Sequence, residues 1–204
     1  MNYLDFRNRF VEFACFSTHQ LGVAFPDFDR NNLTRWQRRG LLVKLRQGFY
    51  AFPEYVAQSN FAFFVSNYIY RPSYISLHTA LAFYGMIPEA VTQITAVSAL
   101  KTAAFDNAFG SFSYMKMKPD LLFGYDILPL GDRSIHIAQP EKALLDLLYL
   151  YPFYNTKSEI ENLRFDEDFV HNDLNIGKLA LYLDRFNNKK LTERIEILTD
   201  FYDI

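Results

Sequence analysis

The chain has 204 residues, of which 50% are hydrophobic, 18% aromatic and 22% charged. That apolar fraction excludes a disordered or low-complexity protein, because such chains cannot bury enough surface to offset the entropy lost on ordering. The net charge of −2 gives, by itself, no reason to expect a nucleic-acid partner. The single cysteine, Cys15, excludes an internal disulfide and a zinc site built from several cysteines.

The sequence carries no signal for secretion or membrane insertion. Its first residues lack the basic segment followed by an apolar core that marks a signal peptide. The most apolar stretch, residues 143–154, contains Asp146 and Pro152 and is too short to span a bilayer. We therefore expect a cytoplasmic protein without membrane contact.

Charge is distributed unevenly along the chain. Residues 1–55 contain eight Lys and Arg against five Asp and Glu, whereas residues 151–204 contain seven against eleven. Residues 30–46 contain six basic side chains and no acid. Because salt limits the reach of each charge to about 10 Å, an anionic partner responds to this local block and not to the net charge.

Three helices are predicted at the N-terminus. Apolar spacing predicts the first over residues 3–16, with a buried stripe that consists of Leu4, Phe6, Phe10 and Phe13. Ser17 or Thr18 is expected to cap a second, short helix that ends near residue 24. Asp27 or Asp29 is expected to cap a third helix over residues 30–39, with Gly40 just after its end.

The third predicted helix has one apolar face and one polar face. Leu33, Trp36 and Gln37 share the first, while Asn31, Arg35 and Arg38 share the second. Residues 41–45 and 49–53 then form two β-rich runs around a turn that contains Gly48. Three helices and a hairpin is the order of a winged helix-turn-helix, in which arginine reads guanine and asparagine reads adenine. A basic helix face is also commonly a solvated surface, but the helix order and the acid-free block together favour DNA binding.

The remainder predicts a mixed domain that ends in helices. A connecting helix is expected over residues 54–70, with an aromatic interdomain face, and Arg71-Pro72 ends it. Ser76 and Gly85 bracket a second helix. The β-rich runs lie at 93–97, 105–112, 110–117 and 135–138, and helices are expected from Pro140 to 151, over 174–186 and over 191–202. The predicted fold is α+β, with domains at residues 1–55 and 56–204.

Four ordered segments resemble the AbiEi-type antitoxins and related regulators of type IV toxin–antitoxin systems. They are residues 32–40 with 45–50, residues 74–89, residues 109–114 and residues 140–147. The resemblance implies a winged helix that binds double-stranded operator DNA and represses its own operon, and a second domain that counteracts a nucleotidyltransferase-like toxin. By position, the implied DNA contacts are Asn31, Asn32, Thr34, Arg35, Arg38, Arg39, Lys44 and Arg46.

Enzyme chemistry is not expected. The four histidines are scattered without metal-ligand spacing, and no nucleophile or phosphate-binding motif is present. Glu141, Lys142 and Asp146 resemble part of a nuclease site, but their spacing is expected to keep them off one common face. Cys15 is expected to be buried and inert. We therefore predict no catalytic residue, no cofactor and no metal.

Two other functions remain open. The chain could be a one-component transcriptional regulator whose second domain senses a ligand or binds a protein, without a toxin. It could also be a nucleic-acid-processing enzyme, which would need metal-dependent activity from Glu141 or Asp146.

Overall fold

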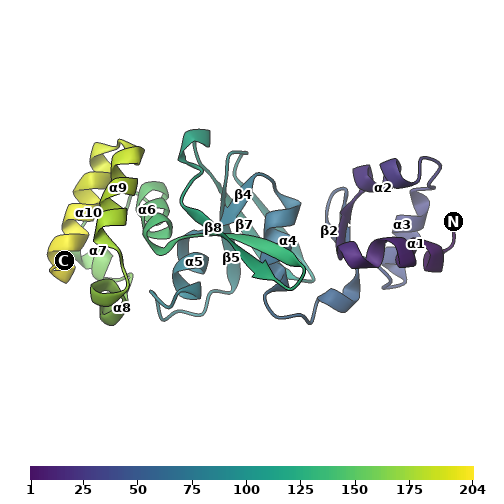
Figure 1. The fold of residues 1–204 in the computed structure, drawn as a ribbon, viewed down its shortest axis with the longest axis horizontal. Coiled ribbons are helices and arrows are strands. Elements are labelled where there is room, and N and C mark those ends of the chain that lie inside the picture. Colours follow the sequence, from purple (N-terminus) through teal and green to yellow (C-terminus); the bar gives the residue numbers. More distant parts are fainter.

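The computed structural model describes all residues from 1 to 204 and is a mixed α and β fold with helices at its C-terminus, as predicted. Its parts follow one another along a single axis (Figure 1). The N-terminal helices lie at one end, a six-stranded sheet lies in the middle, and the C-terminal helices lie at the other end. Chain order is thus preserved along the long axis.

Residues 1–55 fold into three helices and a small sheet. The elements are α1 (Tyr3–Phe10), β1 (Cys15–Ser17), α2 (Thr18–Ala24), α3 (Asn31–Arg38), β2 (Val43–Arg46) and β3 (Phe49–Ala51). The predicted second and third helices and the hairpin are confirmed. Ser17 caps α2 through a capping box with Gln20.

The prediction of one helix over residues 3–16 is wrong beyond Phe10. A short 3-10 turn, Val11–Phe13, follows α1, and Ala14 then takes a left-handed φ of 60° that no helix continues. The chain enters β1 directly afterwards. Phe6 and Phe10 are buried as predicted, but Leu4 and Phe13 are 67% and 57% exposed.

The N-terminal sheet has the order β1-β3-β2 and is antiparallel throughout. Because strand side chains alternate between faces, it contributes to two separate cores. Phe16 and Tyr50 belong to the cluster formed with the three helices. Cys15, Leu45 and Ala51 belong to a different cluster on the opposite face. Both faces of this small sheet are therefore covered.

The central sheet has the order β6-β7-β5-β4-β9-β8. The pairs β5–β7 and β4–β9 are parallel and the other pairs are antiparallel. The strands predicted near 93–97, 105–117 and 135–138 are confirmed, whereas β4 and β8 were not predicted. The strands are β4 (Ser73–Ile75), β5 (Gln93–Ser98), β6 (Ala103–Asn107), β7 (Gly110–Lys116), β8 (Tyr125–Leu130) and β9 (Arg133–Ala138).

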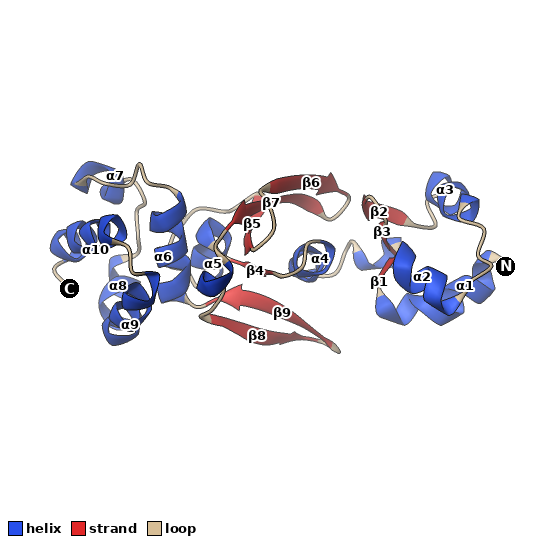
Figure 2. Cartoon of the chain, turned by 90° about the horizontal axis from the view of Figure 1, so that it is seen from above, coloured by secondary structure: helices blue, strands red, loops and turns tan.

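Helices cover both faces of the central sheet. Figure 2 shows α4 (Phe61–Ile69) on the side of the N-terminal unit, and α5 (Leu77–Phe83) and α6 (Pro140–Leu150) on the other side. The connecting helix thus begins later than predicted, at Phe61, after a 3-10 turn at Pro53–Tyr55. Another 3-10 turn, Pro119–Leu121, precedes β8.

The C-terminal helices extend the main core. They are α7 (Lys157–Glu161), α8 (Glu167–Asn172), α9 (Ile176–Phe186) and α10 (Lys189–Tyr202). The last two match the predicted helices, and the two short ones were not predicted. Helices α9 and α10 pack on α6, and α7 packs on α10. None of the helices is long and apolar enough to cross a membrane.

A shared apolar cluster joins residues 1–55 to the rest of the chain. Leu45 and Ala51 of the N-terminal sheet pack with Phe61 and Val65 of α4 and with Phe112 of β7. Hydrogen bonds cross the same contact, among them one from the Asn107 side-chain amide to the Leu45 carbonyl at 3.1 Å and one from Arg133 to the Glu12 carbonyl. The aromatic face predicted for the connecting helix is thus interdomain core, and it holds the N-terminal unit against the sheet.

Candidate nucleic-acid interface

Helix α3 is defined by short-range signals at both of its ends. The Asp29 carboxylate accepts a hydrogen bond from the Asn31 backbone N–H at 3.0 Å, so Asp29 is the capping acid of the two proposed. Gly40 follows the helix with a φ of +69°, a conformation that residues with a side chain rarely adopt. The basic segment is therefore helical because of its own flanking residues.

The apolar face of α3 fixes the helix against α1. Trp36 is 5% exposed, and its ring lies 4.7 Å from that of Phe6 and 5.3 Å from that of Tyr3. Leu33 is buried in the same cluster. Trp36 is core, as its position predicted. Gln37, which was assigned to the same face, is instead exposed.

The opposite face of α3 presents polar and basic groups to solvent. Its exposed residues include the following predicted contacts: Asn31, Thr34, Arg35, Arg38 and Arg39. The nearest acid is Asp29, whose carboxylate lies 3.6 Å from Arg35. Both side chains of that pair are more than half exposed, so water screens the attraction. The guanidinium remains available to an outside acceptor.

Asn32 differs from its neighbours because it is buried. Its side-chain oxygen accepts a hydrogen bond from a terminal nitrogen of Arg35. The amide oxygen is therefore bonded within the helix. Asn32 restricts the orientation of Arg35, which is a positioning role.

The two basic residues of the hairpin lie in different surroundings. Lys44 is exposed on β2. Arg46 turns toward the second domain, where its Nε donates to the Ile69 carbonyl and its guanidinium lies 4.1 Å from the centre of the Phe49 ring. Burial lowers the pKa of Arg46. The geometry opposes the predicted role of Arg46 as a phosphate contact, because its donors already face the interdomain cluster.

The predicted enzyme-like residues do not form an open site. As predicted, Glu141, Lys142 and Asp146 do not converge, but Lys142 and Asp146 do meet, since they are four residues apart on α6. Both are fully buried, and Asp146 also accepts hydrogen bonds from Tyr74 at 2.9 Å and Ser76 at 2.8 Å. Burial lowers the pKa of Lys142 and raises that of Asp146. The group ties α6 to β4 within the main core.

Glu141 and Cys15 also have structural surroundings. The Glu141 carboxylate accepts a hydrogen bond from the Asn175 backbone at 3.0 Å and lies 3.5 Å from the Lys178 ammonium, so it anchors the start of α9. Cys15 is buried, as predicted, although it lies on β1 and not on a helix. Burial raises the pKa of its thiol to about 12, which disfavours the reactive thiolate.

The sequence prediction missed one feature, a cavity of about 640 Å³ on the second domain. Its lining comes from α4, the segment around β4, and the β8–β9 hairpin. These segments are far apart in sequence and two of the strands were not predicted. No short motif could have brought their side chains together.

Comparisons with known proteins assign neither a family nor a function to the chain. No model of a known protein family matches the chain, and no curated protein matches it.

Proposed function

We propose that residues 1–55 form a winged helix-turn-helix that binds double-stranded DNA. The order α1-β1-α2-α3-β2-β3 and the β1-β3-β2 sheet support this assignment. In such a unit the third helix enters the major groove and the β2–β3 hairpin is the wing. Helix α3 is thus the recognition helix.

The observation that carries the proposal is the exposed face of α3. Arg35, Arg38 and Arg39 extend from one short helix without an acid on it, and Asn31 and Thr34 lie among them. Arginine donates two parallel hydrogen bonds to guanine, and asparagine pairs with adenine, from this position in the groove. A face of this composition is suited to reading base edges as well as binding phosphates.

The wing contributes less than the sequence predicted. Lys44 remains exposed and is assigned to a phosphate. Arg46 is assigned to the interdomain contact instead, and Asn32 to the positioning of Arg35. The expected reader is therefore α3 with Lys44 beside it.

We further propose that the protein is a cytoplasmic antitoxin and autorepressor of a type IV toxin–antitoxin operon. The support is the ordered set of segments that resemble the AbiEi-type antitoxins, two of which surround α3 and the start of α6. In this proposal residues 56–204 counteract a nucleotidyltransferase-like toxin. The role is one of binding, and no catalytic residue, cofactor or metal is assigned.

A second candidate is a one-component regulator that responds to a ligand. The cavity on the second domain favours it, because Phe64 and Asn67 of its lining lie on α4, the helix that packs against the N-terminal sheet. The neighbouring gene separates the two candidates: a nucleotidyltransferase-like gene supports the antitoxin, and a metabolic or transport operon supports the ligand-responsive regulator.

Binding to the DNA upstream of the gene tests the DNA proposal. Fluorescence anisotropy should give specific binding to an inverted repeat, with affinity that falls steeply with salt. The variant Arg35→Ala/Arg38→Ala should lose at least about 30-fold in affinity, since each base contact contributes about 1 to 3 kcal/mol and about 1.4 kcal/mol is tenfold. Unchanged affinity in a folded double variant would refute the assignment of α3.

Growth rescue tests the antitoxin proposal separately. The full chain with Arg35→Ala/Arg38→Ala should still protect cells that express the neighbouring toxin, because antitoxicity is assigned to residues 56–204. The full chain is needed, since the two parts share an apolar cluster. Loss of protection at equal protein level would contradict this division of roles.

A further inference from the structure

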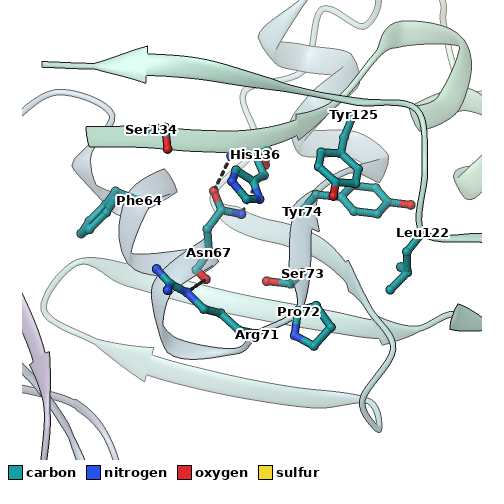
Figure 3. A pocket seen from close by; sticks show the side chains of 10 residues that line it. All are labelled: Phe64, Asn67, Arg71, Pro72, Ser73, Tyr74, Leu122, Tyr125, Ser134 and His136. Atoms are coloured by element: carbon teal, nitrogen blue, oxygen red, sulfur yellow. Dashed lines mark hydrogen bonds between the residues drawn. The ribbon is translucent and has the colours of Figure 1, made fainter. Parts of the chain in front are cut away.

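The cavity on the second domain has the size of a small-molecule site. Its volume is about 640 Å³, within the range of about 300 to 1,000 Å³ that ligand pockets occupy. Figure 3 shows its lining, with α4 on one side and the β8–β9 hairpin on the other. The cavity is distinct from the exposed face of α3.

The electrostatics of this cavity favour a negative ligand with a single charge. Arg71 is the one ionised side chain of the lining, which contains no carboxylate. Its Nε donates to the Asn67 backbone carbonyl at 3.2 Å, and the guanidinium carbon lies 4.8 Å from the centre of the Tyr68 ring. The two terminal nitrogens form no hydrogen bond within the chain. Burial and the nearby Arg71 charge both lower the pKa of His136, so the imidazole is neutral at pH 7. One guanidinium and a neutral histidine match a monoanion better than a phosphate dianion.

A second donor lies in the same cavity without a partner. Ser73 is only 8% exposed, and its hydroxyl forms no hydrogen bond. In Figure 3 this hydroxyl points toward the side of the cavity that holds Arg71. A buried polar group without a partner is destabilising, and an acceptor bound here would satisfy it.

Asn67 holds the walls of the cavity in place. Its side-chain amide donates to the His136 carbonyl at 3.2 Å and accepts from the His136 backbone N–H at 2.8 Å. This two-way bond joins α4 to β9. Because Asn67 also fixes Arg71 through its carbonyl, the guanidinium is positioned before any ligand arrives.

One wall of the cavity consists of stacked aromatic rings. Tyr125 lies 5.0 Å from the ring of Tyr74 and 5.6 Å from that of His136, at an interplanar angle of 16° in both pairs. The three rings form an aromatic wall on the side of the cavity next to Arg71 and Ser73 (Figure 3). A flat ligand ring packs on such a surface in an offset stack.

We propose that this cavity binds a small aromatic monocarboxylate. The carboxylate accepts hydrogen bonds from the terminal nitrogens of Arg71 and from the Ser73 hydroxyl, while the ring lies against Tyr125. The single guanidinium neutralises the charge of the ligand, and the aromatic wall contacts its ring.

An NMR titration of the full chain without DNA tests the proposal. Benzoate and the larger indole-3-acetate are the probes. Benzamide is the control, because it has the shape of benzoate but no charge. The carboxylates should shift the ring signals of His136 and Tyr125 saturably, with a Kd on the order of 1 mM or tighter for fragments of this size. Benzamide should bind at least about 10-fold more weakly, since it lacks the charge-assisted bonds.

Three variants locate the carboxylate. Arg71→Gln should weaken the binding of benzoate about 10-fold, and Ser73→Ala should weaken it by a smaller factor. Arg164→Gln removes an exposed arginine outside the cavity and should leave the affinity unchanged. Arg71 is itself exposed, so its variant should fold.

Any of three results would overturn the proposal. The first is the absence of a saturable shift with both carboxylates. The second is equal binding of benzoate and benzamide, and the third is equal binding of benzoate to the wild type and to Arg71→Gln. Because no DNA is present in the titration, failure of the DNA proposal would leave its result unaffected.

Discussion

Helix α3 and the hairpin that follows it use arginine in opposite ways. Arg35 and Arg38 extend into solvent, whereas Arg46 lies against Phe49 and bonds to the Ile69 carbonyl. All three belong to the same acid-free block of sequence. The difference arises because the outer face of α3 has no neighbour, while the β2–β3 hairpin is covered by α4 and β6.

This difference teaches that a basic segment is not uniformly a binding surface. Exposed cations contribute to the affinity for an anionic partner and little to folding, because water already solvates them. Enclosed cations contribute to folding, because their removal leaves acceptors and ring faces without a partner. Lys142, fully buried beside Asp146, is the extreme of the second kind. The predictions below separate the two kinds by stability and DNA affinity.

Breaking the buried Lys142–Asp146 pair should have the largest effect. Asp146→Ala leaves an ammonium without its partner in the core and should lower the free energy of unfolding by about 3 to 5 kcal/mol. Urea denaturation measures the loss. The matched control is Lys142→Met/Asp146→Asn, which removes both charges but keeps an acceptor for Tyr74 and Ser76. This double variant should be more stable than Asp146→Ala, and the reverse order would contradict the argument.

Removing Arg46 should have the next largest effect, on stability and not on DNA binding. Arg46→Ala deprives the Ile69 carbonyl of its donor and removes the cation from the Phe49 ring, at a cost of about 2 kcal/mol. Urea denaturation and anisotropy on the same sample measure both properties. A loss of DNA affinity without a loss of stability would contradict this assignment and show that Arg46 contacts DNA.

The exposed Lys44 should behave in the opposite manner. Lys44→Ala should reduce the salt dependence of DNA binding, the slope of log K against log salt, by about 1, as expected for one lost phosphate contact. Its effect on unfolding should stay within about 0.5 kcal/mol, since the side chain is exposed. If the slope is unchanged in Lys44→Ala but reduced in Arg46→Ala, then Arg46 contacts a phosphate and Lys44 does not.

Features fixed by neighbouring residues were predictable from the sequence. The cap at Ser17 or Thr18, the cap at Asp27 or Asp29, and Gly40 each act within a few residues, and they placed α2 and α3 correctly. The exposed basic face of α3 followed from helical periodicity once the helix was placed. Pro140 likewise marked the start of α6.

Features fixed by distant partners were not predictable. The strand β1 has three residues and forms by pairing with β3, so its apolar residues looked like a continuation of α1. The strand β8 lies at a sheet edge, where it tolerates Pro129, a residue that argues against a strand in sequence. The enclosure of Arg46 depends on α4 and β6 in the same way. The Lys142–Asp146 pair was within reach of sequence reasoning, because a spacing of four residues aligns side chains on a helix.

The smallest expected effect concerns proton binding beside the exposed cation Arg71. Burial lowers the pKa of His78 and His136 in the folded chain, and Arg71 lowers that of His136 further. An imidazole with a folded pKa below the unfolded value of about 6.5 contributes stability above that pH, and the contribution is lost as the pH falls through the folded pKa. The free energy of unfolding should therefore decrease as the pH is lowered below about 6.5.

The substitution His136→Gln should make this decrease shallower, because glutamine binds no proton in that range. Urea denaturation at a series of pH values measures the slope, and the same substitution at the exposed His19 controls for the loss of a histidine. If His136→Gln leaves the slope unaltered, the imidazole is not excluded from protonation by its surroundings. In that case a second cation would form beside Arg71 as the pH falls, and the cavity would carry two positive charges instead of one.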